Sequence, residues 1–498
     1  MAKISKIIAK LIALTPKWFW LGFIAGLFYF GYIFFWLWSL YPLQSLGVEN
    51  KAAALLFILF LFTITTAGMA LFWGIFSFAV SKFYGKISLL FLPFLSAGVF
   101  VLTEYARAWF FGILWFGNGG MLGPHWTFGS PAYFFTGIKP ILQTASFWGI
   151  YGMDLWAVFL SSSVILFLKT RRKLFLIWMS VAILTIPAIN IFERQSDNQP
   201  SAKIGISIIQ TQKPTKISYS PEETLRDFSQ KLSLLKEAAK NLKENDIIIF
   251  PEGADFSKTL ANFLDPFSVK TFFNKLSAKN LLVIDNNTIS DSVKLRSKTT
   301  FTDSKSGIVG YYDKQLLAPA GEFLPYLIKW PLSIINSSLK NNLEDLREYS
   351  KGTMSNIVRY KNIWAKILVC SDIVSPAMAR RGNFDFILAQ NSLGIFNGSS
   401  LLESQLIAIS RTRAVENEKY LALVSNFGRS FVIDSQGNNQ KITDSGGYKI
   451  LTGDIVPSSV QTWYNKFGDW PVLVLSFLLI LSAILKNFWS RSQKTNAD

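Results

Sequence analysis

Three residues in the second half of the chain have side chains that could work together in nucleophilic catalysis. Glu252, Lys314 and Cys370 each follow a short run rich in Ile, Val, Leu or Phe, which is typical of a buried strand. Strand ends present functional groups in α/β domains, because the sheet aims the side chains while the loops give access. These three residues are therefore the first candidates for an active site.

The three side chains suit attack on an ester. A thiol attacks as thiolate, and a free thiol with a pKa of about 8.5 is mostly protonated at neutral pH. A nearby carboxylate can take the proton, so we predict Cys370 as nucleophile and Glu252 as general base. Lys314 would place a positive charge beside the developing oxyanion. The backbone N–H of Ser371 could complete this oxyanion hole, a contribution typically worth about 3 kcal/mol per donor.

Each candidate also has a structural interpretation. A lone cysteine is more often an inert buried residue. Taken alone, Glu252 would be a turn residue and Lys314 a solvated surface lysine. The only cysteine of the chain, however, stands at a strand end, and the other two residues stand at similar places. We therefore favour the catalytic interpretation for all three.

The elements that would position these residues form an α/β pattern between residues 195 and 460. Short apolar runs predict buried strands. The segments 221–244 and 401–418 have the apolar spacing of helices, and the first begins with Pro and acidic residues. Alternating strands and helices indicate helices packed over sheet faces. The predicted strands are 203–210, 246–250, 280–287, 306–314, 362–372, 384–392, 420–428 and 430–437.

The rest of the chain has the composition of a membrane protein. Half of all residues are hydrophobic and 16% are charged, whereas soluble proteins carry about a quarter charged residues. Runs long enough to span a bilayer, about 20 apolar residues, predict five spans in an N-terminal domain (1–194) and one in a C-terminal segment (461–498), around the catalytic domain (195–460). The candidate spans are 18–40, 52–80, 87–110, 141–168, 174–192 and 471–487.

Basic residues between the spans predict the orientation. If each span crosses once, four basic clusters fall on one side, which is then cytoplasmic. Both termini would be cytoplasmic and the catalytic domain extracytoplasmic. The first apolar stretch is too long for a signal peptide and has no small-residue cleavage site, so we expect a retained anchor. The clusters are Lys3, Lys6, Lys10 and Lys17; Lys82 and Lys86; Lys169, Arg171, Arg172 and Lys173; and Lys486, Arg491 and Lys494.

Composition argues against several other classes of protein. The net charge is +18, but no basic stripe with interleaved aromatics indicates a nucleic-acid partner. With one cysteine and one histidine, the chain can form neither an intrachain disulfide nor the usual zinc site. A Ser-His-Asp triad would need His125, which lies among the membrane segments. We expect no metal and no cofactor. Few charged residues interrupt the spans, which argues against a transporter. Two of them, Glu104 and Arg107, are three residues apart on a predicted helix, and this spacing predicts a structural salt bridge.

The motifs around the three candidates resemble the nitrilase (carbon-nitrogen hydrolase) superfamily. FPEGA (250–254), DKQLLAPAGEFLP (313–325) and ILVCSD (367–372) are similar to its Glu, Lys and Cys motifs, in the same order. The resemblance implies a nitrilase-like αββα sandwich. It also implies that Glu322 holds Lys314 or its loop, and that Asp372 keeps the acidic position after the nucleophile.

Segments outside these motifs narrow the resemblance to the apolipoprotein N-acyltransferases of the bacterial cytoplasmic (inner) membrane. The run 403–420 is similar to a helix with an R-x-R-A-x-E pattern, here with Arg413, whose role as functional or structural stays open. The stretch 462–471 is similar to the lead into the family's final span. The resemblance implies a phospholipid acyl donor, a thioester on Cys370, and the N-terminal amine of diacylglyceryl-cysteine in lipoproteins as acceptor.

The chain departs from this family pattern in ways that concern substrate preference. Five predicted spans precede the catalytic domain where the family has seven. The nucleophile motif reads Cys-Ser-Asp instead of Cys-Tyr-Glu, so Ser371 removes an aromatic wall, and Gln315 replaces a common His. Two alternatives follow: a membrane-anchored amidase or acyltransferase with another acceptor, and a catalytically inactive scaffold or lipid-binding protein.

Two apolar segments of the catalytic domain, 323–339 and 391–400, are unusual for loops. They could pack in the core or form a lid that faces lipid. Because an acyl donor must leave the bilayer, we hypothesise that part of 323–332 is a lipid-facing lid over the active site.

Overall fold

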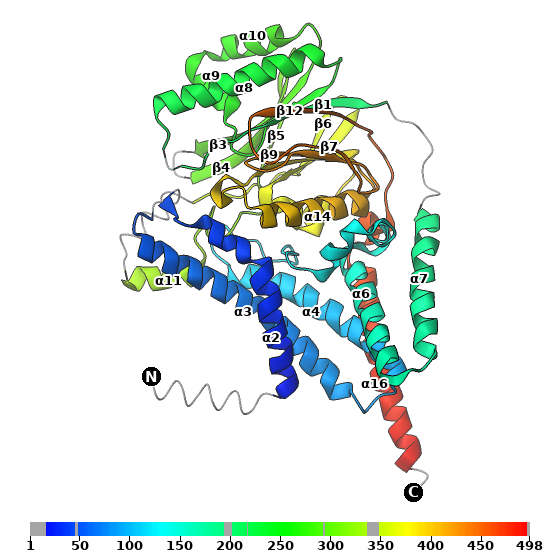
Figure 1. Cartoon of the computed structure of the whole chain (residues 1–498). Coiled ribbons are helices and arrows are strands. Elements are labelled where there is room, and N and C mark those ends of the chain that lie inside the picture. Colours follow the sequence, from blue (N-terminus) through cyan, green and yellow to red (C-terminus); the bar gives the residue numbers. More distant parts are fainter. Residues whose placement is uncertain are drawn as a thin grey trace.

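The computed structural model describes residues 16–44, 48–193, 202–216, 218–291, 294–335 and 348–495. Figure 1 shows two parts: a bundle of long helices, and a layered α/β domain stacked on one end of it. The predicted domain boundaries stay predictions. The boundary at 194/195 and the basic residues Lys3, Lys6 and Lys10 lie outside the described residues.

The helical part contains three stretches long and apolar enough to cross a membrane, of 33, 26 and 26 residues, among the described residues. Two shorter apolar helices accompany them. The chain is accordingly a membrane protein, as predicted. The helical elements are α2 (Lys17–Ile33), η1 (Phe35–Leu40), α3 (Lys51–Phe83), η3 (Leu89–Phe91), α4 (Leu92–Leu114), η4 (Pro131–Gly137), α5 (Lys139–Gln143), α6 (Ala145–Thr170), α7 (Leu174–Glu193), α15 (Trp463–Phe467) and α16 (Trp470–Thr495).

The predicted span 18–40 is not one helix. The α-helix ends at Ile33, and the residues after it form the short 3-10 helix η1. Tyr41 then has extended backbone angles, φ −64° and ψ 134°, which is expected because the residue before a proline avoids the helical region. Hydropathy could not predict this change of direction, since η1 is as apolar as a span.

The predicted span 141–168 is also interrupted. It comprises α5 and α6, and within α6 Gly149 has a positive φ of 67°. A Cβ atom at this position would lie 2.2 Å from the ring of Tyr464. Glycine therefore does two things here: it adopts a conformation that L residues avoid, and it lets the ring of Tyr464 in α15 pack directly on the backbone of α6.

The α/β domain contains two six-stranded sheets, and its predicted fold class is confirmed. Apolar side chains from both sheets, including Ile206, Ile249, Ile367 and Leu388, form a buried core between them. The first sheet has the order β12 (Lys449–Ile455), β1 (Ile204–Gln210), β2 (Ile247–Ile249), β3 (Leu282–Asp291), β4 (Lys294–Asp303), β5 (Gly307–Asp313). The second has the order β11 (Asn439–Ile442), β10 (Phe431–Ile433), β9 (Leu421–Asn426), β8 (Phe386–Ser392), β7 (Ile363–Val369), β6 (Ile357–Tyr360).

Helices cover both outer faces, which gives the expected four-layer sandwich (Figure 1). α8 (Pro221–Asn241), α9 (Phe256–Phe263) and α10 (Pro266–Leu276) pack on the first sheet. α8 begins with a capping box between Ser220 and Glu223, which satisfies backbone groups at the helix start. On the second sheet lie η6 (Cys370–Val374), α13 (Pro376–Arg380) and α14 (Ser400–Asn417).

α14 is the layer shared by the two parts of the molecule. It packs on the second sheet and also contacts α6 and η4 of the helical part. Its polar residues Thr412, Arg413, Glu416 and Asn417 are consequently buried. The α/β domain therefore rests on the helical part through a polar, closely packed layer.

Candidate active site

The structure brings the three predicted residues together from both sheets. Glu252 follows β2, Lys314 follows β5, and Cys370 follows β7 as the first residue of η6. The Nζ atom of Lys314 lies 3.0 Å from Oε1 of Glu252, and the Glu252 carboxylate is near enough to the Cys370 thiol to raise its pKa. The geometry is the one that nucleophilic catalysis requires, and the catalytic roles themselves stay predictions.

Glu322 completes a cluster around the buried ammonium group. Lys314 is 1% exposed and donates a second hydrogen bond to Glu322, at 2.9 Å. The other carboxylate oxygen of Glu322 accepts a 2.7 Å hydrogen bond from the backbone N–H of Ala318. Glu322 thus contacts both the lysine and its loop, the two partners that the sequence resemblance suggested for it.

The electrostatics of the cluster favour a neutral thiol at rest. Burial raises the pKa of Cys370, and the charge of Glu252 raises it further, against the opposing effect of Lys314. Burial also raises the pKa of Glu252, with Lys314 opposing. Burial alone would lower the pKa of Lys314, but the charges of Cys370, Glu252 and Glu322 outweigh it and raise that pKa. Lys314 is thus a permanent cation, and a carboxylate of raised pKa is placed to receive the thiol proton.

The backbone bends sharply at the predicted nucleophile. Cys370 has a φ of 50°, a left-handed conformation that costs an L residue on the order of 1–2 kcal/mol and survives where the surroundings enforce it. Asp372 supplies part of that enforcement. Its buried carboxylate accepts hydrogen bonds from Val369 N (3.0 Å), Leu316 N (2.9 Å) and the hydroxyl of Tyr312 (2.8 Å).

Asp372 therefore holds the nucleophile turn to the segment after β5. Burial raises its pKa to about 6, with Lys314 opposing. The neighbouring Ser371 donates its hydroxyl hydrogen to the carbonyl of Leu316, which binds the same two segments. Ser371 also faces the cavity described below, and the role of its backbone N–H in an oxyanion hole stays a prediction.

Arg413 lies beneath the nucleophile turn, fully buried. Its Nε donates to the carbonyl of Ile373 at 3.1 Å, and its guanidinium forms an ion pair with Glu416. Arg413 and Asp372 are absent from the described residues that line the cavity. Both residues act on the turn from behind, so the structure gives them structural contacts close to the site.

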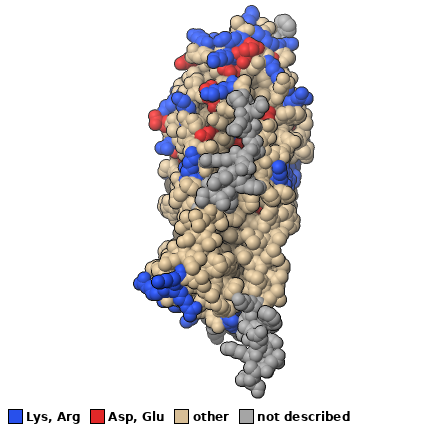
Figure 2. Space-filling view, turned by 90° about the vertical axis from the view of Figure 1, so that its right-hand side faces the viewer, with Lys and Arg blue, Asp and Glu red and all other residues tan. Residues whose placement is uncertain are grey.

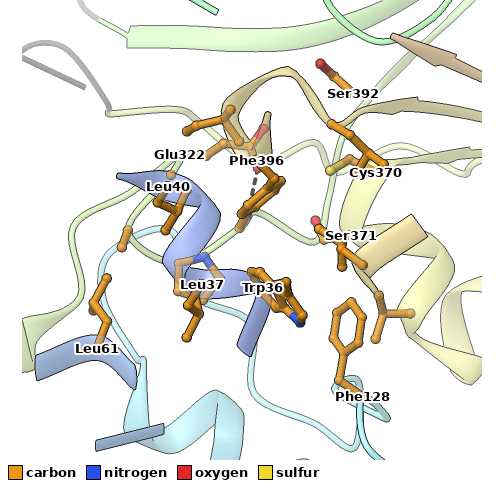
Figure 3. Close-up of a pocket in the computed structure, with 18 of the residues that line it drawn as sticks. Trp36, Leu37, Leu40, Leu61, Phe128, Glu322, Cys370, Ser371, Ser392 and Phe396 are labelled. Atoms are coloured by element: carbon orange, nitrogen blue, oxygen red, sulfur yellow. Dashed lines mark hydrogen bonds between the residues drawn. The ribbon is translucent and has the colours of Figure 1, made fainter. Parts of the chain in front are cut away.

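A cavity of about 280 Å³ joins these groups to the helical part. Glu252, Lys314, Glu322 and Cys370 lie at its polar end. Figure 3 shows η1 entering from the opposite side, with Trp36 and Leu37 facing the cavity and Phe128 closing its lower wall. The apolar lining from the helical part is Phe34, Trp36, Leu37, Leu40, Leu43, Phe57, Leu61, Phe111, Trp115, Trp126 and Phe128.

Sequence reasoning missed this apolar wall. Its residues come from η1 and the residues beside it, from α3 and α4, and from the loop after α4, and each looks like an ordinary membrane residue in the sequence. One signal was available: the aromatic residues Trp115, Trp126 and Phe128 continue beyond the apolar span into a Gly-rich stretch, where a simple loop would be polar.

Of the two apolar segments, 391–400 contributes to the cavity lining, whereas the described residues of 323–339 do not. The lining comes from the loop 318–322, just before the other segment, and from Asn391, Ser392, Leu393, Ile395 and Phe396. Beyond the loop 318–322, α11 (Tyr326–Ile335) lies beside α3 (Figure 1), with Ile328 buried against Leu61 and Trp115. Trp330 on the same helix is 64% exposed. α11 thus has one packed face and one open apolar residue, and its role as a lid stays a hypothesis.

Comparison with known proteins assigns the α/β domain. The family model described as carbon-nitrogen hydrolase matches residues 206–465, more than half of the chain. The chain belongs to the carbon-nitrogen hydrolase family. The resemblance seen in the sequence motifs is confirmed, and this family assignment covers every element that carries Glu252, Lys314 and Cys370.

Similar full-length proteins include three named apolipoprotein N-acyltransferase. The protein from Rickettsia prowazekii is 27% identical over 77% of this chain and 74% of its own length. Those from Haemophilus ducreyi and Vibrio vulnificus are 23% and 24% identical, and cover 83% and 88% of this chain and 78% and 83% of their own lengths. Among solved structures, a carbon-nitrogen hydrolase superfamily protein from Xanthomonas campestris is 18% identical, with a TM-score of 0.36, over 51% of this chain and 91% of that one. The likeness to the named relatives covers more of the chain than the carbon-nitrogen hydrolase domain and so extends into the helical part.

Proposed function

We propose that this member of the carbon-nitrogen hydrolase family is an apolipoprotein N-acyltransferase. In this proposal it moves an acyl chain from a membrane phospholipid, through a thioester on Cys370, to the N-terminal amine of diacylglyceryl-cysteine in a lipoprotein. The observation that carries the proposal is the cavity that joins Glu252, Lys314 and Cys370 to apolar walls from the membrane helices. The names of its relatives support the choice of acceptor.

The first half-reaction forms the thioester. Sγ of Cys370 attacks the ester carbonyl while its proton passes to the Glu252 carboxylate. The negative charge on the carbonyl oxygen is stabilised by Lys314 and the N–H of Ser371. The C–O bond then breaks, and the leaving lysophospholipid oxygen takes the proton back from Glu252. The acyl group remains on Cys370, and no net proton is gained or lost.

The second half-reaction uses the same groups in the same order. The acceptor amine attacks the thioester carbonyl and gives one proton to Glu252. The C–S bond breaks, the amide leaves, and the Cys370 sulfur recovers that proton. A thioester is more reactive toward an amine than the original ester, so the covalent intermediate divides a difficult transfer into two easier steps.

The apolar wall suits a donor that arrives from a bilayer. Lipid tails are as apolar as leucine, so a chain loses little when it moves from the membrane into a cavity lined by Trp36, Leu37 and Phe128. Exposing the chain to water instead would cost about 0.8 kcal/mol for each CH₂ group. Phospholipid is therefore the acyl donor that we propose.

We further propose the bacterial cytoplasmic (inner) membrane as location, with an extracytoplasmic catalytic domain (195–460) between an N-terminal membrane domain (1–194) and a C-terminal segment (461–498). Figure 2 shows Lys and Arg gathered at the end of the bundle remote from the α/β domain, beyond a band without charged side chains. The exposed residues there include Lys82, Lys86, Lys169, Arg171, Arg172 and Lys173. Such a basic end favours the cytoplasmic side, where both termini would lie.

Mass spectrometry tests the first half-reaction directly. The purified full-length protein is incubated with phosphatidylethanolamine vesicles, and the intact mass and the Cys370 peptide are measured. We expect a hydroxylamine-labile acyl adduct on that peptide, absent in Cys370→Ala and in Glu252→Gln. Adding a diacylglyceryl-cysteine peptide should remove the adduct and acylate the peptide. A folded protein with a reactive thiol but no adduct would contradict the proposal, and an adduct that only other amines discharge would change the acceptor.

A further inference from the structure

The loop between α4 and η4 contains a short segment, residues 125–128, whose side chains alternate between two tasks. Trp126 and Phe128 line the cavity. His125 and Thr127 face the other way and contact the chain that follows the nucleophile. Both polar residues are buried, with 6% and 1% exposure. One short piece of backbone in the helical part thus contributes to the cavity wall with some side chains and contacts the catalytic domain with the others.

Polar side chains hold three consecutive residues after the nucleophile. The carbonyl of Ile373 accepts from Arg413 Nε at 3.1 Å, the carbonyl of Val374 accepts from Thr127 Oγ1 at 2.7 Å, and Ser375 Oγ lies 2.8 Å from His125 Nδ1. One of these contacts comes from α14, and the other two come from the helical part. The end of η6 is therefore held across the junction of the two parts.

In the hydrogen bonds around Thr127, the donor and the acceptor of each bond can be assigned. Arg413 Nη2 donates to the hydroxyl of Tyr133 at 2.7 Å. The Tyr133 hydroxyl lies 2.7 Å from Thr127 Oγ1, and because the Thr127 proton goes to the Val374 carbonyl, Tyr133 must donate to Thr127. Every hydroxyl then donates once and accepts at least once. A buried network satisfied in this way is rigid and tolerates few alternative arrangements.

His125 contacts a serine that caps the next helix. Burial lowers the pKa of His125 to about 4, aided by the charge of Arg381, so the imidazole is neutral at neutral pH. Ser375 Oγ also accepts from Met378 N at the start of α13. The histidine thereby holds the residue that caps the helix after the nucleophile turn.

Buried charges of the membrane helices fix the other end of the segment. Arg107 in α4 donates to the carbonyl of Phe128 at 2.8 Å and pairs with Glu104 at 2.8 Å, as the sequence spacing predicted. Asp154 in α6 accepts from Ser130 Oγ at 2.7 Å and from Ala132 N at 3.0 Å. Residues 125–132 are thus tied to two membrane helices, so their position is that of the bundle.

We propose that His125 and Thr127 are positioning residues for acyl transfer, through which the helical part sets the placement of the Cys370 turn. The proposal rests on the proposed function and deepens it, because the segment that walls the acyl cavity also holds the nucleophile turn. A nucleophile must sit within a fraction of an ångström of its attack position, and a displacement of about 1 Å can cost about a hundredfold in rate. The left-handed backbone of Cys370 makes such support necessary.

The test is single-turnover acylation of the full-length protein by phosphatidylethanolamine vesicles, followed by intact mass. Thr127→Val keeps the shape of the side chain and removes its hydrogen bonds. We expect the acylation rate constant to fall by about ten- to a hundredfold, with half-saturation by donor within about twofold and the final adduct still near one per chain. Thr127→Ser, which retains the hydroxyl, should restore most of the rate.

Thr136→Val is the matched control. Thr136 is 4% exposed, lies near the same loop, and donates to the carbonyl of Tyr133 at 2.9 Å, without contacting the nucleophile turn. It should lower the melting temperature about as much as Thr127→Val does and leave the acylation rate within about twofold. Equal rates for wild type and Thr127→Val, or equal losses for Thr127→Val and Thr136→Val, would overturn the proposal.

A second readout separates this proposal from the proposed function. If the wild type forms no acyl adduct, the proposed function fails, and alkylation of Cys370 by iodoacetamide then tests the positioning alone. Thr127→Val should change the alkylation rate constant at least about threefold, whereas Thr136→Val should not. If Thr127→Val does not fold, His125→Asn takes its place, because it shortens the side chain that contacts Ser375. The acylation and alkylation rate constants of this variant then decide the outcome.

Discussion

The polar end and the apolar end of the cavity are formed by different kinds of elements and residues. At the polar end, Glu252, Lys314 and Cys370 follow strands of two sheets, and each side chain has a chemical identity that sequence reveals. At the apolar end, Trp36, Leu37 and Phe128 come from helices and a loop of the membrane part, and no chemical identity distinguishes them from other membrane residues. The comparison teaches that reactivity is local in this molecule, whereas the choice of substrate depends on surfaces brought together by folding.

The largest expected effect is at the polar end. Replacing Cys370 with alanine removes the nucleophile, so turnover should fall by about 10⁴-fold or more, with thermal stability nearly unchanged because the side chain is small and only partly buried. Acylation of a diacylglyceryl-cysteine peptide measures this directly. Residual turnover within tenfold of wild type would mean that the polar end is not the reactive end.

The next effect concerns the charge at Lys314. Lys314→Met keeps the length of the side chain but leaves Glu252 and Glu322 without their shared cation. We expect acylation to fall by about 10²–10³-fold, because an oxyanion donor is lost. The free energy of unfolding should fall by about 3 kcal/mol, since breaking a buried ion pair strands its partners. Lys294→Met, at an exposed pair with Glu348, is the matched control and should change neither quantity measurably.

At the apolar end, Leu37→Glu should reduce kcat/KM for phospholipid by about ten- to a hundredfold, because a carboxylate in the acyl path must be desolvated or protonated. The polar end is untouched, so iodoacetamide should still alkylate Cys370 at the wild-type rate. If Leu37→Glu lowers the rates of acylation and alkylation by the same factor, the apolar end and the polar end do not act independently.

The pH dependence of the acylation rate should reflect the ionisation of Glu252 at the polar end. Glu252 must be ionised to accept the thiol proton, and burial raises its pKa. The acylation rate should therefore decline as pH falls through a midpoint above the usual value for glutamate, by about tenfold per unit below it. A pH–rate profile of single-turnover acylation measures the midpoint. Leu37→Phe, a change at the apolar end, should leave that midpoint unchanged. If the midpoint moves in this variant, the assignment of the pH dependence to Glu252 is wrong.

The smallest effect is expected on the open face of α11. Trp330 is 64% exposed, so Trp330→Ala should alter stability by less than about 0.5 kcal/mol and leave detergent-based turnover within about twofold. Ile328 on the same helix is 3% exposed, and Ile328→Ala should cost about 2–5 kcal/mol. If Trp330→Ala slows turnover in vesicles and not in detergent, α11 acts as the lipid-facing lid that the sequence suggested.

The strand predictions show which patterns sequence reasoning could recognise. Strongly apolar runs such as those of β1, β8 and β9 were predicted nearly at their observed bounds. The structure adds β4, β6, β11 and β12, which were missed. β11 is exposed along its whole length and β12 is mostly half-exposed, so their pairing partners, and not their own hydrophobicity, make them strands.

For the site, the sequence by itself determined the reactive groups and their order, because Glu252, Lys314 and Cys370 stand beside strands whose apolar residues must be buried. It also predicted the pairing of Glu104 with Arg107, which depends on helical spacing alone. Only the tertiary structure decided that η1 turns away from the span, that Asp372 and Arg413 act from behind the nucleophile turn, and that residues 125–128 meet it. The physical reason is that these contacts join residues up to several hundred positions apart, and their energy exists only when both parts are folded and packed together.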